Sequence, residues 1–224
     1  MSVRLAVFDV DGTLVDSREI IWRAAREASA DVGLPEPDYD RVRRVVGLSL
    51  GDALRALAPE LAGAELEAFV ERYKASFLRM HATPGFAEPL YDGAEDLLQR
   101  LRRGGWTVAM ATGKSRRGVE RWLARDGWAE IFASTHCADD GPGKPDPAML
   151  LAAMKAAGAG PERTVMIGDT SHDMLMAVNA GVRPQGVAWG FQTADEVRAA
   201  GAVHVAESFA ELEAELDRFA HAFA

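Results

Sequence analysis

The chain has 224 residues, of which 48% are hydrophobic, so it can form one large domain or two smaller ones around a buried core. Its formal net charge of -9 argues against a surface that binds nucleic acid or an anionic membrane, because the long-range field repels both, but it permits a small anionic substrate. A single cysteine, Cys137, excludes an internal disulfide, and with no secretory signal or membrane span in view we expect a cytoplasmic protein.

The first predicted element is a short buried strand, Leu5–Phe8, which is followed at once by two acids. Asp9 and Asp11 are two residues apart, so they share a face if the strand conformation continues. Gly12 then permits a sharp turn. Carboxylates this close repel each other unless a cation or a shared proton lies between them, and a hard cation with oxygen ligands suits them best. The alternative is a strand end with two solvated acids.

The next stretch has helical periodicity and contains no convincing strand. Asp16 and Glu19 have the form of a capping box at its start. Breaks rich in glycine and proline divide the stretch into several helices. We therefore predict an all-helical domain at residues 16–84, inserted into a core domain made of residues 1–15 and 85–224.

Predicted strands and helices alternate in the rest of the chain. The predicted strands are Trp106–Ala111, Ile131–Ser134, Thr164–Ile167, Gly186–Trp189 and Val203–Val205. This alternation predicts an α/β fold, a Rossmann-like parallel sheet with helices on both faces, joined by right-handed crossovers. Ligands of such sheets bind beyond the carboxyl ends of the strands, where Asp9, Thr112 and Asp169 all fall.

Asp169 and Asp173 form a candidate metal site with Asp9. The two acids lie in the segment Gly-Asp-Thr-Ser-His-Asp and are four residues apart, so they lie on one face if a helix begins near the first of them. Together with Asp9 they make an all-oxygen cluster that suits Mg²⁺. The alternative for Asp169 is a simple helix N-cap.

Thr112, Gly113 and Lys144 are the candidate phosphate ligands. The Thr112 hydroxyl and the Gly113 amide follow a buried strand and can donate to a phosphoryl oxygen, although an N-cap role for Thr112 is equally compatible. Lys144 lies in Gly-Lys-Pro-Asp-Pro, which lacks the glycine and hydroxyl residues of a nucleotide-binding P-loop. A lone lysine is more often a solvated surface charge, but among several carboxylates and a phosphate it is an obvious counter-charge.

The residues Asp9 to Ser17 read Asp-Val-Asp-Gly-Thr-Leu-Val-Asp-Ser. This segment resembles the first motif of the haloacid dehalogenase superfamily, whose members are mostly magnesium-dependent phosphohydrolases. Thr112, Lys144 and the Asp169–Asp173 pair follow in the order of that superfamily's other motifs. The chain is most similar to the phosphoglycolate phosphatase-like group.

The resemblance implies a role for each of these residues. Asp9 would be the nucleophile that forms an aspartyl phosphate, and Asp11 would protonate the leaving group and then activate water. The backbone carbonyl of Asp11 would bind Mg²⁺ together with Asp9, Asp169 and Asp173. Thr112, with Lys144, would be both catalytic and substrate-binding, and Gly113 would bind the phosphoryl group.

The helical insert matches a cap domain that closes over the active site and contacts the leaving group. The turn from Arg43 to Ser49 is the best candidate for substrate contact, because it combines cations with a glycine and a hydroxyl group. Within it we assign Arg44 to substrate binding. The alternative is that these arginines only solvate a helix end.

The expected function is therefore Mg²⁺-dependent hydrolysis of a small, phosphoglycolate-like phosphorylated metabolite through an aspartyl-phosphate intermediate. Two alternatives stay open: a sugar phosphomutase of the same fold, and a non-enzymatic aspartyl phospho-acceptor. Release of phosphate over many turnovers would exclude the acceptor. We expect no nucleic acid or membrane partner, and a monomer or a homodimer.

Overall fold

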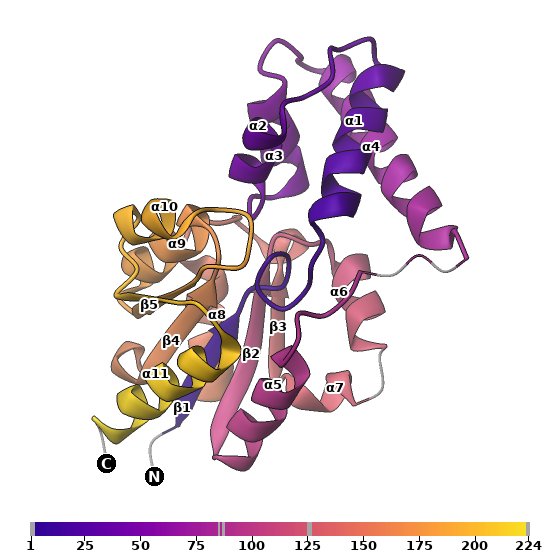
Figure 1. Ribbon diagram of the computed structural model, residues 1–224. Coiled ribbons are helices and arrows are strands. Elements are labelled where there is room, and N and C mark those ends of the chain that lie inside the picture. Colours follow the sequence, from indigo (N-terminus) through magenta and orange to yellow (C-terminus); the bar gives the residue numbers. More distant parts are fainter. Residues whose placement is uncertain (1–2, 85, 87, 125–126, 223–224) are drawn as a thin grey trace.

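A six-stranded parallel sheet forms the centre of the computed structural model, which describes residues 3–84, 86, 88–124 and 127–222 (Figure 1). The strand order is β3-β2-β1-β4-β5-β6. The first strand of the chain, β1 (Arg4–Phe8), thus lies in the middle, between β2 (Trp106–Thr112) and β4 (Thr164–Gly168). The outer strands are β3 (Ser134–Cys137), β5 (Arg183–Val187) and β6 (His204–Ala206).

The helices fall into a group that precedes β2 and a group that alternates with the later strands. They are α1 (Arg18–Asp31), α2 (Tyr39–Val45), α3 (Leu50–Leu57), α4 (Ala64–Ala82), α5 (Ala94–Arg103), α6 (Arg116–Leu123), α7 (Trp128–Ile131), α8 (Ala148–Ala157), α9 (Ser171–Ala180), α10 (Ala194–Ala199) and α11 (Phe209–His221). Within the described part of the chain, none of these helices has the length and apolar character needed to cross a membrane.

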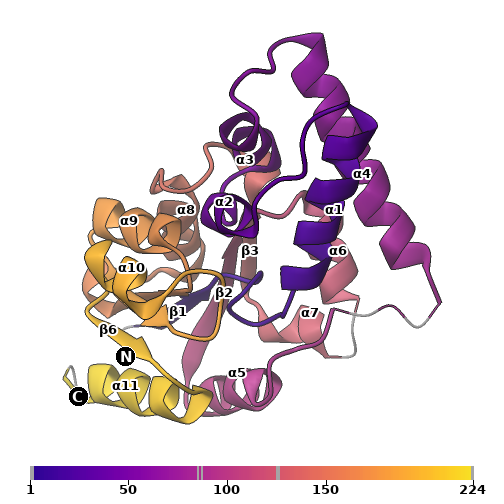
Figure 2. The ribbon, with the colours of Figure 1, turned by 45° about the horizontal axis from the view of Figure 1, so that its top comes forward.

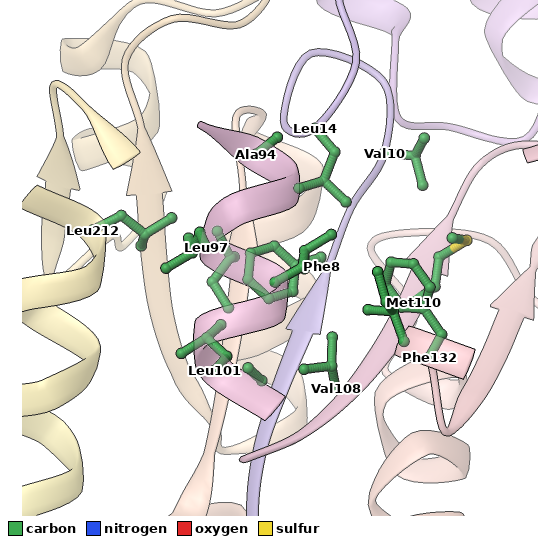
Figure 3. Close-up of a cluster of buried hydrophobic side chains, with 14 of the residues drawn as sticks. Phe8, Val10, Leu14, Ala94, Leu97, Leu101, Val108, Met110, Phe132 and Leu212 are labelled. Carbon is green, nitrogen blue, oxygen red and sulfur yellow. The ribbon is translucent and has the colours of Figure 1, made fainter. Parts of the chain in front are cut away.

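Helices cover both faces of the sheet because neighbouring strand residues point in opposite directions. Phe8 of β1 packs against α5 and α11 on one face, and Figure 3 shows Leu97 and Leu101 of α5 beside it. Leu5 and Val7 of the same strand pack against α8 and α9 on the other face. Since both faces are buried, the strand is apolar from Leu5 to Phe8 and shows no alternation there.

The helices α1–α4 form a separate layer above the carboxyl ends of the strands (Figures 1 and 2). They pack around their own apolar core, which includes Val42, Leu54, Leu57 and Phe69. The predicted fold, a parallel sheet with helices on both faces and a helical cap inserted after the first strand, is confirmed. The domain boundaries after residues 15 and 84 stay a prediction.

Three local predictions are wrong. The strand predicted at Gly186–Trp189 lies earlier in the chain, because β5 runs from Arg183 to Val187. Where a strand was predicted at Ile131–Ser134, Ile131 ends α7, the next two residues are a connection, and β3 begins only at Ser134. Ile131 is apolar because it is buried in the core beneath the sheet, and burial alone does not distinguish a strand from a helix. The capping box at Asp16 is absent, since α1 begins at Arg18 and the Asp16 carboxylate accepts hydrogen bonds from that arginine.

Candidate active site

Three predicted site residues meet at one edge of the sheet. Phe8 of β1 pairs with Ile167 of β4, and the next amide, that of Asp9, donates to the Ile167 carbonyl at 2.9 Å. Thr112 ends β2, and Asp169 follows β4 directly. Because the three strands are parallel neighbours, their carboxyl ends place these side chains side by side.

Asp9 is almost fully buried, with 1% of its surface exposed, and is paired with Lys144. The Lys144 ammonium lies 2.7 Å from one carboxylate oxygen of Asp9 and 2.6 Å from one of Asp173. Burial raises the pKa of Asp9 to about 7 even though Lys144 acts in the opposite direction. Lys144 is therefore a buried counter-charge shared by two acids, not a solvated surface lysine.

Asp169 and Asp173 complete a buried cluster with Asp9, in which one oxygen atom of each acid lies within 4.8 Å of the others. Asp169 accepts hydrogen bonds from the Thr13 hydroxyl at 2.9 Å and from the Phe191 amide at 2.7 Å. Burial and the neighbouring acids raise the pKa of Asp169 well above its ordinary value. A bound cation would stabilise the ionised form of these acids. A set of carboxylate oxygens suits a hard divalent ion.

The start of α9 orients Asp173. Thr170 is the N-cap of this helix, and its hydroxyl donates to Asp173 at 2.7 Å while the Thr170 amide donates at 3.1 Å to the same oxygen. The N-cap is thus Thr170, so the simple cap role considered for Asp169 does not apply. Asp9 Oδ2 has no hydrogen-bond partner among the described residues, which leaves an acceptor for a cation or a substrate.

Asp11 lies apart from this cluster and has a lysine of its own. Its side chain is 13% exposed and lies 2.8 Å from the ammonium of Lys114, which is also 3.7 Å from Glu88. Asp9 and Asp11 are therefore each paired with a different lysine. The two side chains both line one cavity, where the charge of Asp11 adds to the rise in the pKa of Asp9 and the lysines oppose their repulsion.

Thr112 and Gly113 lie where the core meets the cap. Thr112 is fully buried, and its hydroxyl accepts a hydrogen bond from the Lys114 amide at 3.2 Å. A Cβ atom at Gly113 would lie 2.6 Å from the carbonyl oxygen of Leu48, a residue of the cap turn. Only glycine permits this approach, so the cap turn rests directly on the end of β2.

The cap turn is tied to the core by its arginines. Arg43 forms a 2.7 Å ion pair with Glu196 of α10, and the Arg44 carbonyl accepts a 3.0 Å hydrogen bond from His172. The Arg44 side chain is 62% exposed, lies 3.7 Å from Glu196 and is not part of the cavity lining. In this arrangement the residues of the turn that line the cavity run from Val45 to Ser49, and substrate binding by Arg44 stays a prediction.

A cavity of about 660 Å³ lies between the cap and the core. Asp9 and Asp11 line it from the end of β1, Gly113 and Lys114 from the end of β2, and apolar side chains line it from the cap. Two acids and the lysine paired with one of them therefore meet a space that can hold a ligand, and Lys144 lies behind Asp9.

A family model described as "Haloacid dehalogenase-like hydrolase" matches residues 6–187. The chain belongs to this family. The probable phosphatase IndB of Dickeya dadantii is 35% identical over 93% of this chain and 91% of that protein. Phosphoglycolate phosphatase 1 of Pseudomonas aeruginosa is 35% identical over 84% of this chain and 70% of that protein. The tyrosine-protein kinase PtkA of Mycobacterium tuberculosis is 33% identical over 87% of this chain, which spans only 65% of the kinase.

The fold agrees with the family. A hydrolase from Pseudomonas syringae superposes with a TM-score of 0.83 at 28% identity, covering 96% of this chain and 98% of that one. The likeness to phosphoglycolate phosphatases that the segment from Asp9 to Ser17 implied is confirmed. The predicted enzyme class, a phosphoric monoester hydrolase of the haloacid dehalogenase family, is confirmed as well.

In this hydrolase the sequence left several residues of the site unassigned. Lys114 could have been predicted as a site residue, because it follows Thr112 and Gly113 directly beyond a buried strand. No local sequence pattern indicates Glu88 as a site residue, because only the folded chain brings it to Lys114. The Phe191 amide acts through its backbone, so no side-chain pattern could reveal it.

Gly190 provides a test of the acidic cluster. A Cβ atom there would lie 2.2 Å from a carboxylate oxygen of Asp169, so Gly190→Ala must displace this acid. We expect the affinity for Mg²⁺, measured by calorimetric titration, to fall by about tenfold or more. Gly51→Ala is the matched control, because a Cβ at that position meets nothing within 4 Å. Equal affinities of the two variants would contradict the role of Asp169.

Proposed function

We propose that this hydrolase is a Mg²⁺-dependent phosphatase that removes the phosphoryl group from a small phosphorylated metabolite through an aspartyl-phosphate intermediate. The observation that carries the proposal is the buried Asp9 carboxylate, which faces the cavity beside Lys144 and two further acids. The named phosphatases among the relatives support the same activity. Phosphoglycolate and similar small esters are the first substrates to test.

The residues can divide the chemistry between two half-reactions. Asp9 attacks the phosphorus atom, and the ester bond breaks as Asp11 gives its proton to the leaving oxygen. Asp11 then takes a proton from water, the water oxygen attacks the phosphorus of the acyl phosphate, and Asp9 is released with inorganic phosphate. General acid–base help of this kind contributes roughly 10²–10⁴-fold to the rate.

The remaining residues stabilise charge on the phosphoryl group. Asp9, Asp169 and Asp173, with the backbone carbonyl of Asp11, would hold Mg²⁺, which supplies positive charge to the phosphoryl oxygens when bound. Lys144 supplies a fixed ammonium beside Asp9. We assign the Thr112 hydroxyl and the Gly113 amide to the phosphoryl oxygens.

Removal of divalent metal should abolish turnover and leave the fold intact. The buried acids need a cation to remain ionised together, whereas the apolar core of the sheet does not depend on them. The measurement is phosphate release from a panel of phosphorylated metabolites, with and without EDTA, alongside circular dichroism. More than a few per cent of activity after EDTA treatment would contradict the metal assignment. Phosphate release limited to one equivalent would instead indicate a phospho-acceptor.

A further inference from the structure

The cavity above Asp9 and Asp11 is much larger than a phosphoglycolate-like substrate requires. Its volume of about 660 Å³ is within the range of about 300–1,000 Å³ that is typical of sites for drug-sized ligands. The phosphoryl group has to lie at the floor, close to Asp9. Glycolate, one of the smallest possible leaving groups, would leave most of the remaining space to water.

The wall that the cap contributes is mainly apolar. Ile21 of α1, Leu54 of α3, and Val70 and Tyr73 of α4 line it, so the cavity opens into the apolar core between the cap helices. Ile21, Val70 and Tyr73 are only half-buried, which leaves apolar surface that a ligand can cover. Covering such surface is favourable by roughly 25 cal/mol per Å².

The wall that α6 contributes is cationic. Arg117 and Arg121 both line the cavity, and at a spacing of four residues they lie on one face of the helix. Neither guanidinium forms an ion pair with any residue that the structure describes. Arg121 acts on Glu88 only through its field, so both guanidinium groups keep their hydrogen-bond donors free of ion pairs with the described residues and form a site for a carboxylate or a phosphate.

The other charges at the cavity are already engaged. Lys114 pairs with Asp11 and Glu88, and Lys74 pairs with Glu71 at 2.8 Å. Asp139 accepts a hydrogen bond from the backbone amide of Arg116 at 2.7 Å. The arginine pair on α6 is therefore the cationic part of the lining that is left for a ligand.

We propose that the natural substrate is a phosphomonoester whose leaving group joins an apolar ring system or chain to a second anionic group. The phosphoryl group lies at Asp9, the apolar body lies against Val70 and Tyr73 of the cap, and the second anion pairs with Arg117 and Arg121. This inference rests on the proposed function, because it names the substrate class of the same site.

The test compares three esters that differ in one feature at a time. They are 6-carboxy-2-naphthyl phosphate, 2-naphthyl phosphate and phosphoglycolate, each assayed for kcat/KM in the presence of Mg²⁺. We expect the carboxylated naphthyl ester to exceed the uncharged one by about tenfold, and both to exceed phosphoglycolate. In the double variant Arg117→Gln/Arg121→Gln, kcat/KM for the carboxylated naphthyl ester should fall to that of the uncharged one. The kcat/KM for 2-naphthyl phosphate should stay unchanged. Arg102→Gln/Arg103→Gln, on exposed positions of α5, is the matched control.

Two results would overturn the inference: a higher kcat/KM for phosphoglycolate than for both naphthyl esters, or an equal loss for both naphthyl esters in the double variant. Hydrolysis of any of the three esters would still support the proposed function. If none is hydrolysed, the inference is tested without turnover. The measurement is then the affinity of the protein for 6-hydroxy-2-naphthoate and for 2-naphthol, obtained by calorimetry. Tighter binding of the naphthoate, lost in the double variant, supports the inference, whereas equal binding of the two overturns it.

Discussion

Asp9→Asn and Asp11→Asn should both abolish steady-state turnover but differ in what accumulates on the protein. Asparagine at position 9 removes the nucleophile, so no acyl phosphate can form. Asparagine at position 11 leaves the buried Asp9 carboxylate and its partner Lys144 in place and removes only the acid and base. With a good leaving group such as p-nitrophenolate, which needs little protonation, the first step should continue. Hydrolysis of the intermediate still needs a base, so phospho-Asp9 should accumulate.

The measurement is labelled phosphate retained on the protein after acid quenching, followed by treatment with hydroxylamine. We expect an acid-stable, hydroxylamine-sensitive label on the Asp11→Asn variant and none on Asp9→Asn. Asp139→Asn is a suitable control, because this acid also lines the cavity but its partner among the described residues is a backbone amide at the start of α6. A label on the Asp9→Asn protein, or full activity in either of the two catalytic variants, would contradict the proposed mechanism.

Lys144→Met should reduce kcat/KM by at least about a hundredfold, because the ammonium lies 2.7 Å from the nucleophile and its loss removes charge stabilisation beside the phosphoryl group. It should also destabilise the metal-free protein. The Lys144 side chain is fully buried between Asp9 and Asp173, and its removal leaves these carboxylates together without a cation. Breaking a buried ion pair in this way costs about 3–5 kcal/mol.

Denaturant unfolding with and without Mg²⁺ separates these two effects. We expect Mg²⁺ to restore part of the lost free energy of unfolding in the variant, because the ion supplies the missing positive charge. Lys155→Met, at an exposed position of α8, is the matched control and should change neither activity nor stability appreciably. If Lys144→Met behaved like this control, Lys144 would have no role in neutralising the acids.

The helical cap and the active site differ in how far local patterns could predict them. The cap follows from helical periodicity interrupted by glycine and proline, and its position after the first strand could be read directly. For the turn from Arg43 to Ser49 the sequence predicted contact with the substrate, and its residues from Val45 to Ser49 line the cavity. The Arg44 side chain lies 3.7 Å from Glu196, an acid more than 150 residues away in the chain, and its role in substrate binding stays a prediction. Charge alone cannot indicate which of several neighbouring side chains faces a cavity.

The sequence by itself determined the parallel sheet and the set of chemical groups at its carboxyl edge, whereas the central place of the first strand came from the structure. It could do so because the buried strands are continuous apolar runs, and because Asp9, Thr112 and Asp169 follow strand ends directly. The tertiary structure alone decided how the charges pair: Lys144 with Asp9 and Asp173, Lys114 with Asp11 and Glu88, and neither Arg117 nor Arg121 with any described residue. The physical reason is that secondary structure follows from local periodicity, whereas ion pairs and cavities depend on distances between segments that the chain brings together only when the core and the cap pack.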